Sequence, residues 1–176
     1  MLVAIGGLPG VGKTTVARAV AGALPAAHVR IDALEVALVR QGVVAEGEVG
    51  PHGYGLALAV ADTCLASGGH VVVDAVFDVH EARQPWDELA ARYGTELHWV
   101  RLVCSDPAEH RRRVVERSAD IAGHQLPSWD DVTGRVVDTW DQPHSVVDTA
   151  AGDPVATVLA ALQGVQDPGA GPTVRS

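Results

Sequence analysis

The chain has 176 residues, of which 47% are apolar, enough for one sizeable core and one domain without room for a second. Its net charge of −9 has the wrong sign for gripping a long nucleic acid, so substrates of that class are excluded. The two cysteines lie far apart and form no C-x-x-C pair, the N-terminus has no basic leader, and no apolar run reaches about 20 residues. These features predict a cytoplasmic protein without a membrane segment.

The first half of the chain alternates short apolar runs with stretches of helical periodicity. Glycine and proline punctuate these stretches and set the boundaries between the elements. The sequence predicts a strand at 2–5, a helix at 14–24, a strand at 28–31 followed by Asp32, a helix at about 33–40, an irregular segment at 42–53 and a helix at 54–66.

The second half continues the same alternation, and Asp106-Pro107 opens a helix that Asp caps. The predicted elements are a strand at 71–74, a helix at 81–93, a strand at 97–103, a helix from 107, a lid-like polar stretch at 118–127, a helix at 128–140, a strand at 145–148 and a helix at 154–162. We therefore expect an α/β domain at 1–163, a doubly wound five-stranded parallel sheet with a helical lid at about 106–140, and a flexible tail at 164–176. Ligands of such sheets bind beyond the carboxyl ends of the strands.

The segment between the first strand and the first helix matches G-x-x-x-x-G-K-[ST] at every position. Its glycines let backbone N–H groups turn inward around phosphates, and Lys13, the only lysine in the chain, would neutralise the transferring phosphoryl group. The alternative is a glycine-rich turn that binds nothing. We expect ATP to contact Gly7, Leu8, Pro9, Gly10, Val11, Gly12, Lys13, Thr14 and Thr15, with Arg113.

Two residues have the oxygen chemistry and the placement of Mg²⁺ ligands. Thr14 offers a hydroxyl at the phosphate-binding loop, and Asp74 ends an apolar strand as a Walker B acid does. Ala75 stands where motor ATPases keep a hydrolytic Glu, which argues against a hydrolytic motor. Asp74 could bind the ion directly or through water, and its alternative reading is a turn or capping residue.

Asp32 is the candidate general base, because a carboxylate at the end of the second strand can accept the proton of an incoming hydroxyl. It could equally cap the helix that begins at Ala33, and both roles are compatible. Asp78, just after the third strand, is a weaker candidate for contacting the substrate, as is Asp74.

Arginines gather on the helix that follows Asp106-Pro107. Arg113 and Arg117 are four residues apart and share one face. They are either a solvated basic surface or part of a lid that folds over ATP and stabilises the transferring charge, as arginine fingers do. We assign both a catalytic role beside Lys13, without deciding which one points at the phosphates.

These motifs together resemble the small P-loop kinases, a group that includes chloramphenicol phosphotransferase, gluconate and shikimate kinases and the kinase domain of polynucleotide kinases. The resemblance rests on Gly7 to Thr14, on Val29-Arg30-Ile31-Asp32, on Val72 to Phe77 and on the arginine pair, and it covers nearly the whole chain. It implies that Asp32 is the catalytic base and that Val147-Asp148-Thr149 is the adenine-side loop. The loop sequence departs from that of the chloramphenicol enzyme, which leaves the acceptor open.

The sequence therefore predicts an ATP- and Mg²⁺-dependent phosphotransferase that transfers the γ-phosphate to a hydroxyl of a small molecule, such as an antibiotic or another natural product. Two alternatives remain: an ATP-binding regulatory module, and a toxin-like kinase that acts on a nucleotide sugar. The partner is a small hydroxyl compound rather than a long nucleic acid or a membrane. An acceptor-sized space between Asp32, Asp78 and the helix of Tyr54 would favour the kinase, whereas side chains filling that space would weaken it.

Overall fold

A computed structural model describes residues 1–165 of the chain. The strands are β1 (Leu2–Gly6), β2 (Ala27–Arg30), β3 (Val71–Asp74), β4 (Leu97–Val103) and β5 (His144–Asp148). The helices are α1 (Lys13–Ala23), α2 (Ile31–Arg40), α3 (His52–Ala66), α4 (His80–Tyr93), α5 (Pro107–Glu116), α6 (Trp129–Thr133) and α7 (Pro154–Val165). The tail expected at 164–176 lies outside the described residues except for its first two, which continue α7.

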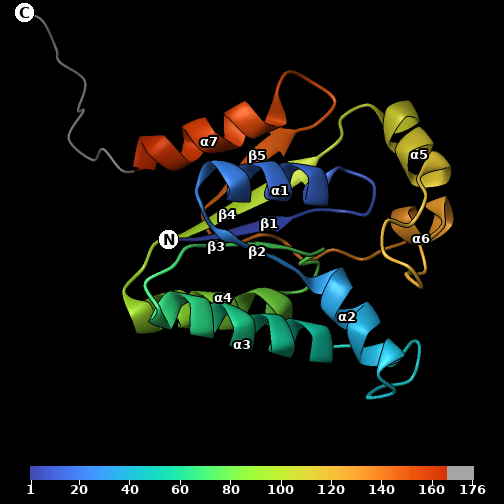
Figure 1. Ribbon diagram of the computed structural model, residues 1–176. Coiled ribbons are helices and arrows are strands. Elements are labelled where there is room, and N and C mark those ends of the chain that lie inside the picture. Colours follow the sequence, from blue (N-terminus) through green and yellow to red (C-terminus); the bar gives the residue numbers. More distant parts are fainter. Residues whose placement is uncertain (166–176) are drawn as a thin grey trace, which may run out of the picture.

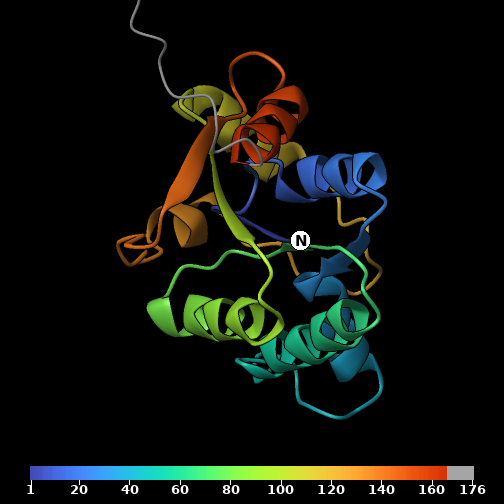
Figure 2. The ribbon, with the colours of Figure 1, turned by 90° about the vertical axis from the view of Figure 1, so that its left-hand side faces the viewer.

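The five strands form one parallel sheet in the order β2-β3-β1-β4-β5. Helices cover both faces, with α1 and α7 on one side and α3 and α4 on the other (Figures 1 and 2). The doubly wound sheet predicted from the sequence is confirmed. The first strand lies at the centre, with β3 on one side and β4 on the other, so its carboxyl end is the point where the strand order reverses and where ligands of open α/β sheets bind.

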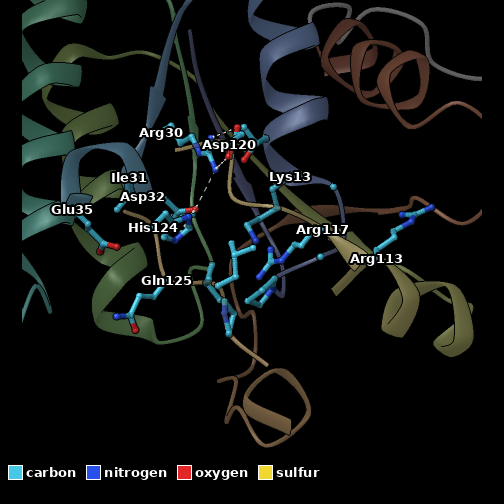
Figure 3. A pocket seen from close by; sticks show the side chains of 18 of the residues that line it. Lys13, Arg30, Ile31, Asp32, Glu35, Arg113, Arg117, Asp120, His124 and Gln125 are labelled. Carbon is cyan, nitrogen blue, oxygen red and sulfur yellow. Dashed lines mark hydrogen bonds and ion pairs between the residues drawn. The ribbon is translucent and has the colours of Figure 1, made fainter. Parts of the chain in front are cut away.

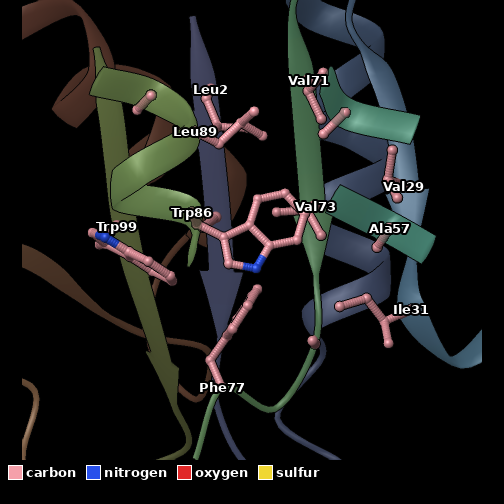
Figure 4. Close-up of a cluster of buried hydrophobic side chains, with 14 of the residues drawn as sticks. Leu2, Val29, Ile31, Ala57, Val71, Val73, Phe77, Trp86, Leu89 and Trp99 are labelled. Atoms are coloured by element: carbon pink, nitrogen blue, oxygen red, sulfur yellow. The ribbon is translucent and has the colours of Figure 1, made fainter. Parts of the chain in front are cut away.

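Each face of the sheet has its own apolar core. Beneath α1 and α7 the core is aliphatic, because these helices present small and branched side chains such as Val16, Ala17 and Val158 to the sheet. Under α3 and α4 aliphatic side chains surround a group of aromatic rings (Figure 4). There the ring of Phe77 packs edge to face against Trp99 at 5.1 Å and Trp86 at 6.0 Å between centroids. Such geometry suits the ring quadrupoles and holds the segment after β3 firmly in place.

Most predicted boundaries differ from the structure by at most two residues, as at the start of α3, and two of the differences bear on the site. The second strand ends at Arg30, so Asp32 lies in the first turn of α2 rather than at a strand end. Ile31 is apolar and buried in either arrangement, so its pattern does not distinguish the end of a strand from the start of a helix. A negative side chain in a first helical turn is stabilised by the helix dipole, which fits Asp32 there.

The helix expected at 128–140 was also too long, since α6 covers only Trp129–Thr133 and Gly134 is its C-cap. Beyond it, the backbone pairs with other segments instead of with itself. The amide of Asp138 donates to the carbonyl of Asp78, and the buried Arg83 donates to the carbonyl of Thr139, both at 2.8 Å. Tertiary contacts therefore override the local helical periodicity.

Candidate functional site

A cavity of about 1060 Å³ opens at the carboxyl end of the sheet, where β1 runs into the glycine-rich loop (Figure 3). Its floor is the loop from Pro9 to Thr15, and α5 with the segment after it forms one wall. The opposite wall comes from α2, the start of α3 and the segment after β3. Among the predicted site residues, the cavity is lined by Pro9, Gly10, Gly12, Lys13, Thr14, Thr15, Asp32, Asp78, Arg113 and Arg117.

The glycine-rich loop has the backbone that its sequence demands. Gly7, Gly10 and Gly12 have φ angles of 141°, 85° and 93°, which side-chain-bearing residues rarely adopt. A Cβ on Gly10 would lie 2.5 Å from Val114 of α5, and His110 of the same helix has its Nε2 2.9 Å from the carbonyl oxygen of Pro9. The fifth helix therefore clamps the loop in position as well as supplying the arginines.

Lys13 lies at the centre of the site, where its Nζ donates a hydrogen bond to the carbonyl of Leu8 at 3.0 Å. Burial lowers the pKa of this lysine to about 8, an effect that the charges of Asp32 and Asp74 partly offset and that of Arg117 reinforces. An ammonium group that is poorly solvated before a ligand arrives gains strongly from a polyanion.

Asp74 is 2% exposed, and both of its oxygens are engaged. Its Oδ2 accepts a hydrogen bond from the hydroxyl of Thr14 at 2.7 Å, and its Oδ1 is 2.6 Å from Nε2 of His28. Thr14 and Asp74 thus lie together at the loop, and a hydroxyl with a carboxylate is the oxygen donor set that suits Mg²⁺. No three His, Cys, Asp or Glu side chains gather into a metal cage within residues 1–165, so the rest of a Mg²⁺ shell would come from phosphate and water.

Asp32 projects into the cavity from the first turn of α2. Its Oδ2 is 3.7 Å from Arg30 and 4.0 Å from the Nε2 of His124, so its ion pairs are loose and its side chain stays 35% exposed. A carboxylate held near the phosphate loop without a tight partner remains available to accept a proton.

The two predicted arginines have different surroundings. Arg113 is held in place: its Nε donates to Glu109 at 2.7 Å, and its two Nη atoms donate to the hydroxyl and carbonyl of Thr149 at 2.9 and 3.0 Å. Arg117 has buried Nε and Nη2 atoms without a hydrogen-bond partner in the described part of the chain. In Figure 3, Arg117 lies beside Lys13 while Arg113 extends away from it.

Asp78 is paired rather than free. Its Oδ2 accepts a hydrogen bond from Arg135 at 2.7 Å. The preceding residue, Phe77, has a φ of 53°, and its amide donates to the hydroxyl of Tyr54 at 3.3 Å. A bulky residue in this backbone region is strained, and strain of this kind persists only where surrounding contacts enforce it. Phe77 therefore fixes the direction in which Asp78 enters the cavity.

Glu35 follows Asp32 by one helical turn and lines the same cavity. Burial and, secondarily, the charge of Asp32 raise the pKa of Glu35 to about 7. In the unfolded chain the same carboxyl titrates near 4.3. Between these values the folded state holds a proton that the unfolded state has released, so the free energy of unfolding falls as the pH rises through this window.

We expect Glu35→Gln to remove that loss of stability. The free energy of unfolding of the variant should exceed that of the wild type by about 1–2 kcal/mol at about pH 8, a value already reduced because Glu35 is partly exposed. The difference should be smaller at about pH 5. Urea unfolding at the two pH values measures it, with the exposed Glu88→Gln as the control. A difference that is the same at both pH values would contradict the assigned pKa.

Several residues of the site were not predicted from the sequence, among them His28, Glu35 and Arg135. A signal existed for Glu35, since i and i+3 positions share one face of a helix. It existed more faintly for His28, which is two residues before Arg30 on a strand that pairs with the strand of Asp74. Arg135 had none, because it lies in the segment wrongly predicted as helix.

The comparisons with known proteins agree with this geometry. No curated protein matches the sequence. Solved structures that share the fold include three with a bound nucleotide or a named kinase activity. They are Kti12 from Chaetomium thermophilum in complex with ADP-AlF3 (20% identity, TM-score 0.69, 97% of this chain and 100% of that one), a gluconokinase from Sinorhizobium meliloti (24%, 0.62, 93% and 91%) and the APS kinase CysC of Mycobacterium tuberculosis in complex with AMPPNP and APS (18%, 0.61, 94% and 96%).

No helix in the described residues is both long and apolar enough to cross a membrane. The family described as "AAA domain" (AAA_33) matches residues 2–142. This range includes the glycine-rich loop, Asp32, Asp74, Arg113 and Arg117. The chain belongs to the AAA_33 family and has the fold of the small P-loop kinases.

Proposed function

We propose that this protein is an ATP-dependent phosphotransferase whose acceptor is a hydroxyl of a small molecule, with an antibiotic or another natural product as one such acceptor. The observation that carries the proposal is the open cavity itself. The space between Asp32, Asp78 and Tyr54 is not filled by side chains, and it is continuous with the phosphate-binding loop. A protein that only held a nucleotide would have no need of additional space facing a loosely paired carboxylate.

The transfer would follow from the positions of five side chains. Asp32 accepts the proton of the acceptor hydroxyl while the oxygen of that hydroxyl bonds to the γ-phosphorus. The bond between this phosphorus and the bridging oxygen breaks, and ADP leaves. Lys13 and Arg117 stabilise the charge on the transferring group. Thr14 and Asp74 would hold Mg²⁺, which shields the phosphate charge when bound. With His28 on one oxygen and Thr14 on the other, Asp74 is better suited to hold the ion through water.

Asp32→Asn tests the role of the base. The amide has the same shape but accepts no proton, so transfer should fall by about 10² to 10⁴-fold while ATP affinity is kept. Acceptor-stimulated release of ADP across a panel of hydroxylated metabolites measures transfer, and calorimetry measures ATP binding. Unchanged transfer in the variant would falsify the assignment of Asp32. If no acceptor stimulated ADP release although ATP bound, the regulatory-module alternative would be favoured.

A further inference from the structure

The cavity is lined from both sides of the central strand β1. On the β4 and β5 side, Arg113 lines it and donates to Thr149 of the predicted adenine-side loop. On the β2 and β3 side, α2, the start of α3 and the segment after β3 form what we call the acceptor half. Its charged side chains are Arg30, Asp32, Glu35, Asp78, Asp120 and Arg135.

Both arginines of the acceptor half already pair with a carboxylate, and Asp120 also lies 3.8 Å from Arg18. Arg30 donates two hydrogen bonds to Asp120, at 2.6 and 3.0 Å, and Arg135 donates to Asp78 at 2.7 Å. The bond to Asp120 also ties β2 to the segment at 117–128. An acceptor with a carboxylate or a phosphate would have to compete with Asp120 or Asp78 for these arginines before either could bind it.

Two carboxyl groups of this half accept no hydrogen bond from a cation in the described part of the chain. Asp32 has only contacts of 3.7 and 4.0 Å, and Glu35 forms no ion pair with any arginine or lysine in the described part of the chain. They lie three residues apart on α2, so both face the cavity, and their Cβ atoms are about 5–6 Å apart. The Glu35 side chain is also fixed, because Gly53 at the start of α3 leaves just enough room for it: a Cβ on Gly53 would clash with Cγ of Glu35.

We propose that the acceptor is an amino alcohol, a compound with a protonated amine and without carboxylate or phosphate, which places its reacting hydroxyl at Asp32 and its ammonium group at Glu35. This inference rests on the proposed function and names the acceptor class for the same site. The spacing of the two carboxyl groups requires the amine to lie within a few bonds of the hydroxyl. The raised pKa of Glu35 agrees, since a nearby ammonium group would recover the ionised form that burial disfavours.

The test compares matched ligands in calorimetric titrations of the protein loaded with Mg²⁺ and a non-hydrolysable ATP analogue. Glucosamine and 2-deoxystreptamine supply the amine, N-acetylglucosamine removes its charge, gluconate replaces it by a carboxylate, and UDP-N-acetylglucosamine adds a diphosphate. We expect the amines to bind at least about tenfold more tightly than the N-acetyl compound, because hydrogen bonds to charged partners are the stronger ones. Gluconate and the nucleotide sugar should bind least.

Glu35→Gln should reduce the preference for the amine over its N-acetyl form to near unity, whereas Glu88→Gln, which changes a carboxylate outside the cavity, should keep it. Tighter binding of gluconate or the nucleotide sugar, no binding of either amine at millimolar concentration, or a preference unaffected by Glu35→Gln would each overturn the inference. Turnover with ATP separates the two proposals. Transfer to gluconate alone refutes the amino alcohol but keeps the phosphotransferase. Amines that bind at Glu35 and are never phosphorylated, with no other acceptor phosphorylated, refute the phosphotransferase and leave only an amine-binding site.

Discussion

Lys13→Ala is expected to abolish nucleotide binding and phosphoryl transfer together, with a loss in kcat/KM of at least about 10³-fold. The ammonium group of Lys13 is buried within the phosphate loop itself, and burial has already removed much of its hydration. Its interaction with a polyphosphate is therefore large in both the bound and the transition state. Calorimetry with Mg·ATP measures the first effect, and ADP release with an acceptor measures the second.

Lys13→Arg is the matched control for charge. A planar guanidinium cannot take the place of a compact ammonium beside the carbonyl of Leu8, so this variant should recover little of the loss although it keeps the charge. Neither change should lower the melting temperature much, because a buried ammonium adds little to stability. An alanine variant that still bound ATP with the wild-type affinity would contradict the assigned role of the loop.

The second large effect is expected at Arg117 rather than at Arg113. Arg117→Ala should lower kcat by about 10³-fold or more, in the range of arginine fingers, while the KM for ATP changes little. The buried guanidinium of Arg117 has no partner among residues 1–165 for its Nε and Nη2, so the charge that it can stabilise comes from the ligand. Burial lowers its pKa, which an arriving phosphate would reverse.

Arg113→Ala provides the comparison, since this arginine lies in the same cavity wall but holds Glu109 and Thr149. Its loss should appear as a lower melting temperature and a higher KM for ATP, with a kcat effect well below that of Arg117→Ala. Steady-state kinetics and thermal unfolding of both variants distinguish the two cases. The opposite order of kcat effects would mean that Arg113 reaches the transferring group.

The fold followed from the sequence because each of its signals is local. A strand, a glycine loop and a helix are recognisable from periodicity and punctuation, and parallel strands then bring Lys13 and Asp74 to the same edge of the sheet. The sequence did not show which side chains form hydrogen bonds and ion pairs with residues far along the chain. Whether Arg113 or Arg117 faces the phosphates depends on Thr149, which is 36 residues from Arg113 along the chain.

The same limit explains the wrong boundary after α6, where contacts to Asp78 and Arg83 replace the helical hydrogen bonds. It also explains why the sequence alone predicts no role for Glu35, since a glutamate on a helix face is ordinarily solvated. Only the approach of α3, made possible by Gly53, turns this glutamate into a half-buried group facing a cavity.

The most direct test is to follow the phosphorus NMR spectrum of Mg·ATP and the purified protein with each acceptor of the panel. Wild-type protein should convert the γ-phosphate signal into that of a phosphomonoester, and Asp32→Asn should leave it nearly unchanged. Inorganic phosphate as the sole product, or a spectrum that no acceptor alters, would contradict transfer to an alcohol at this site.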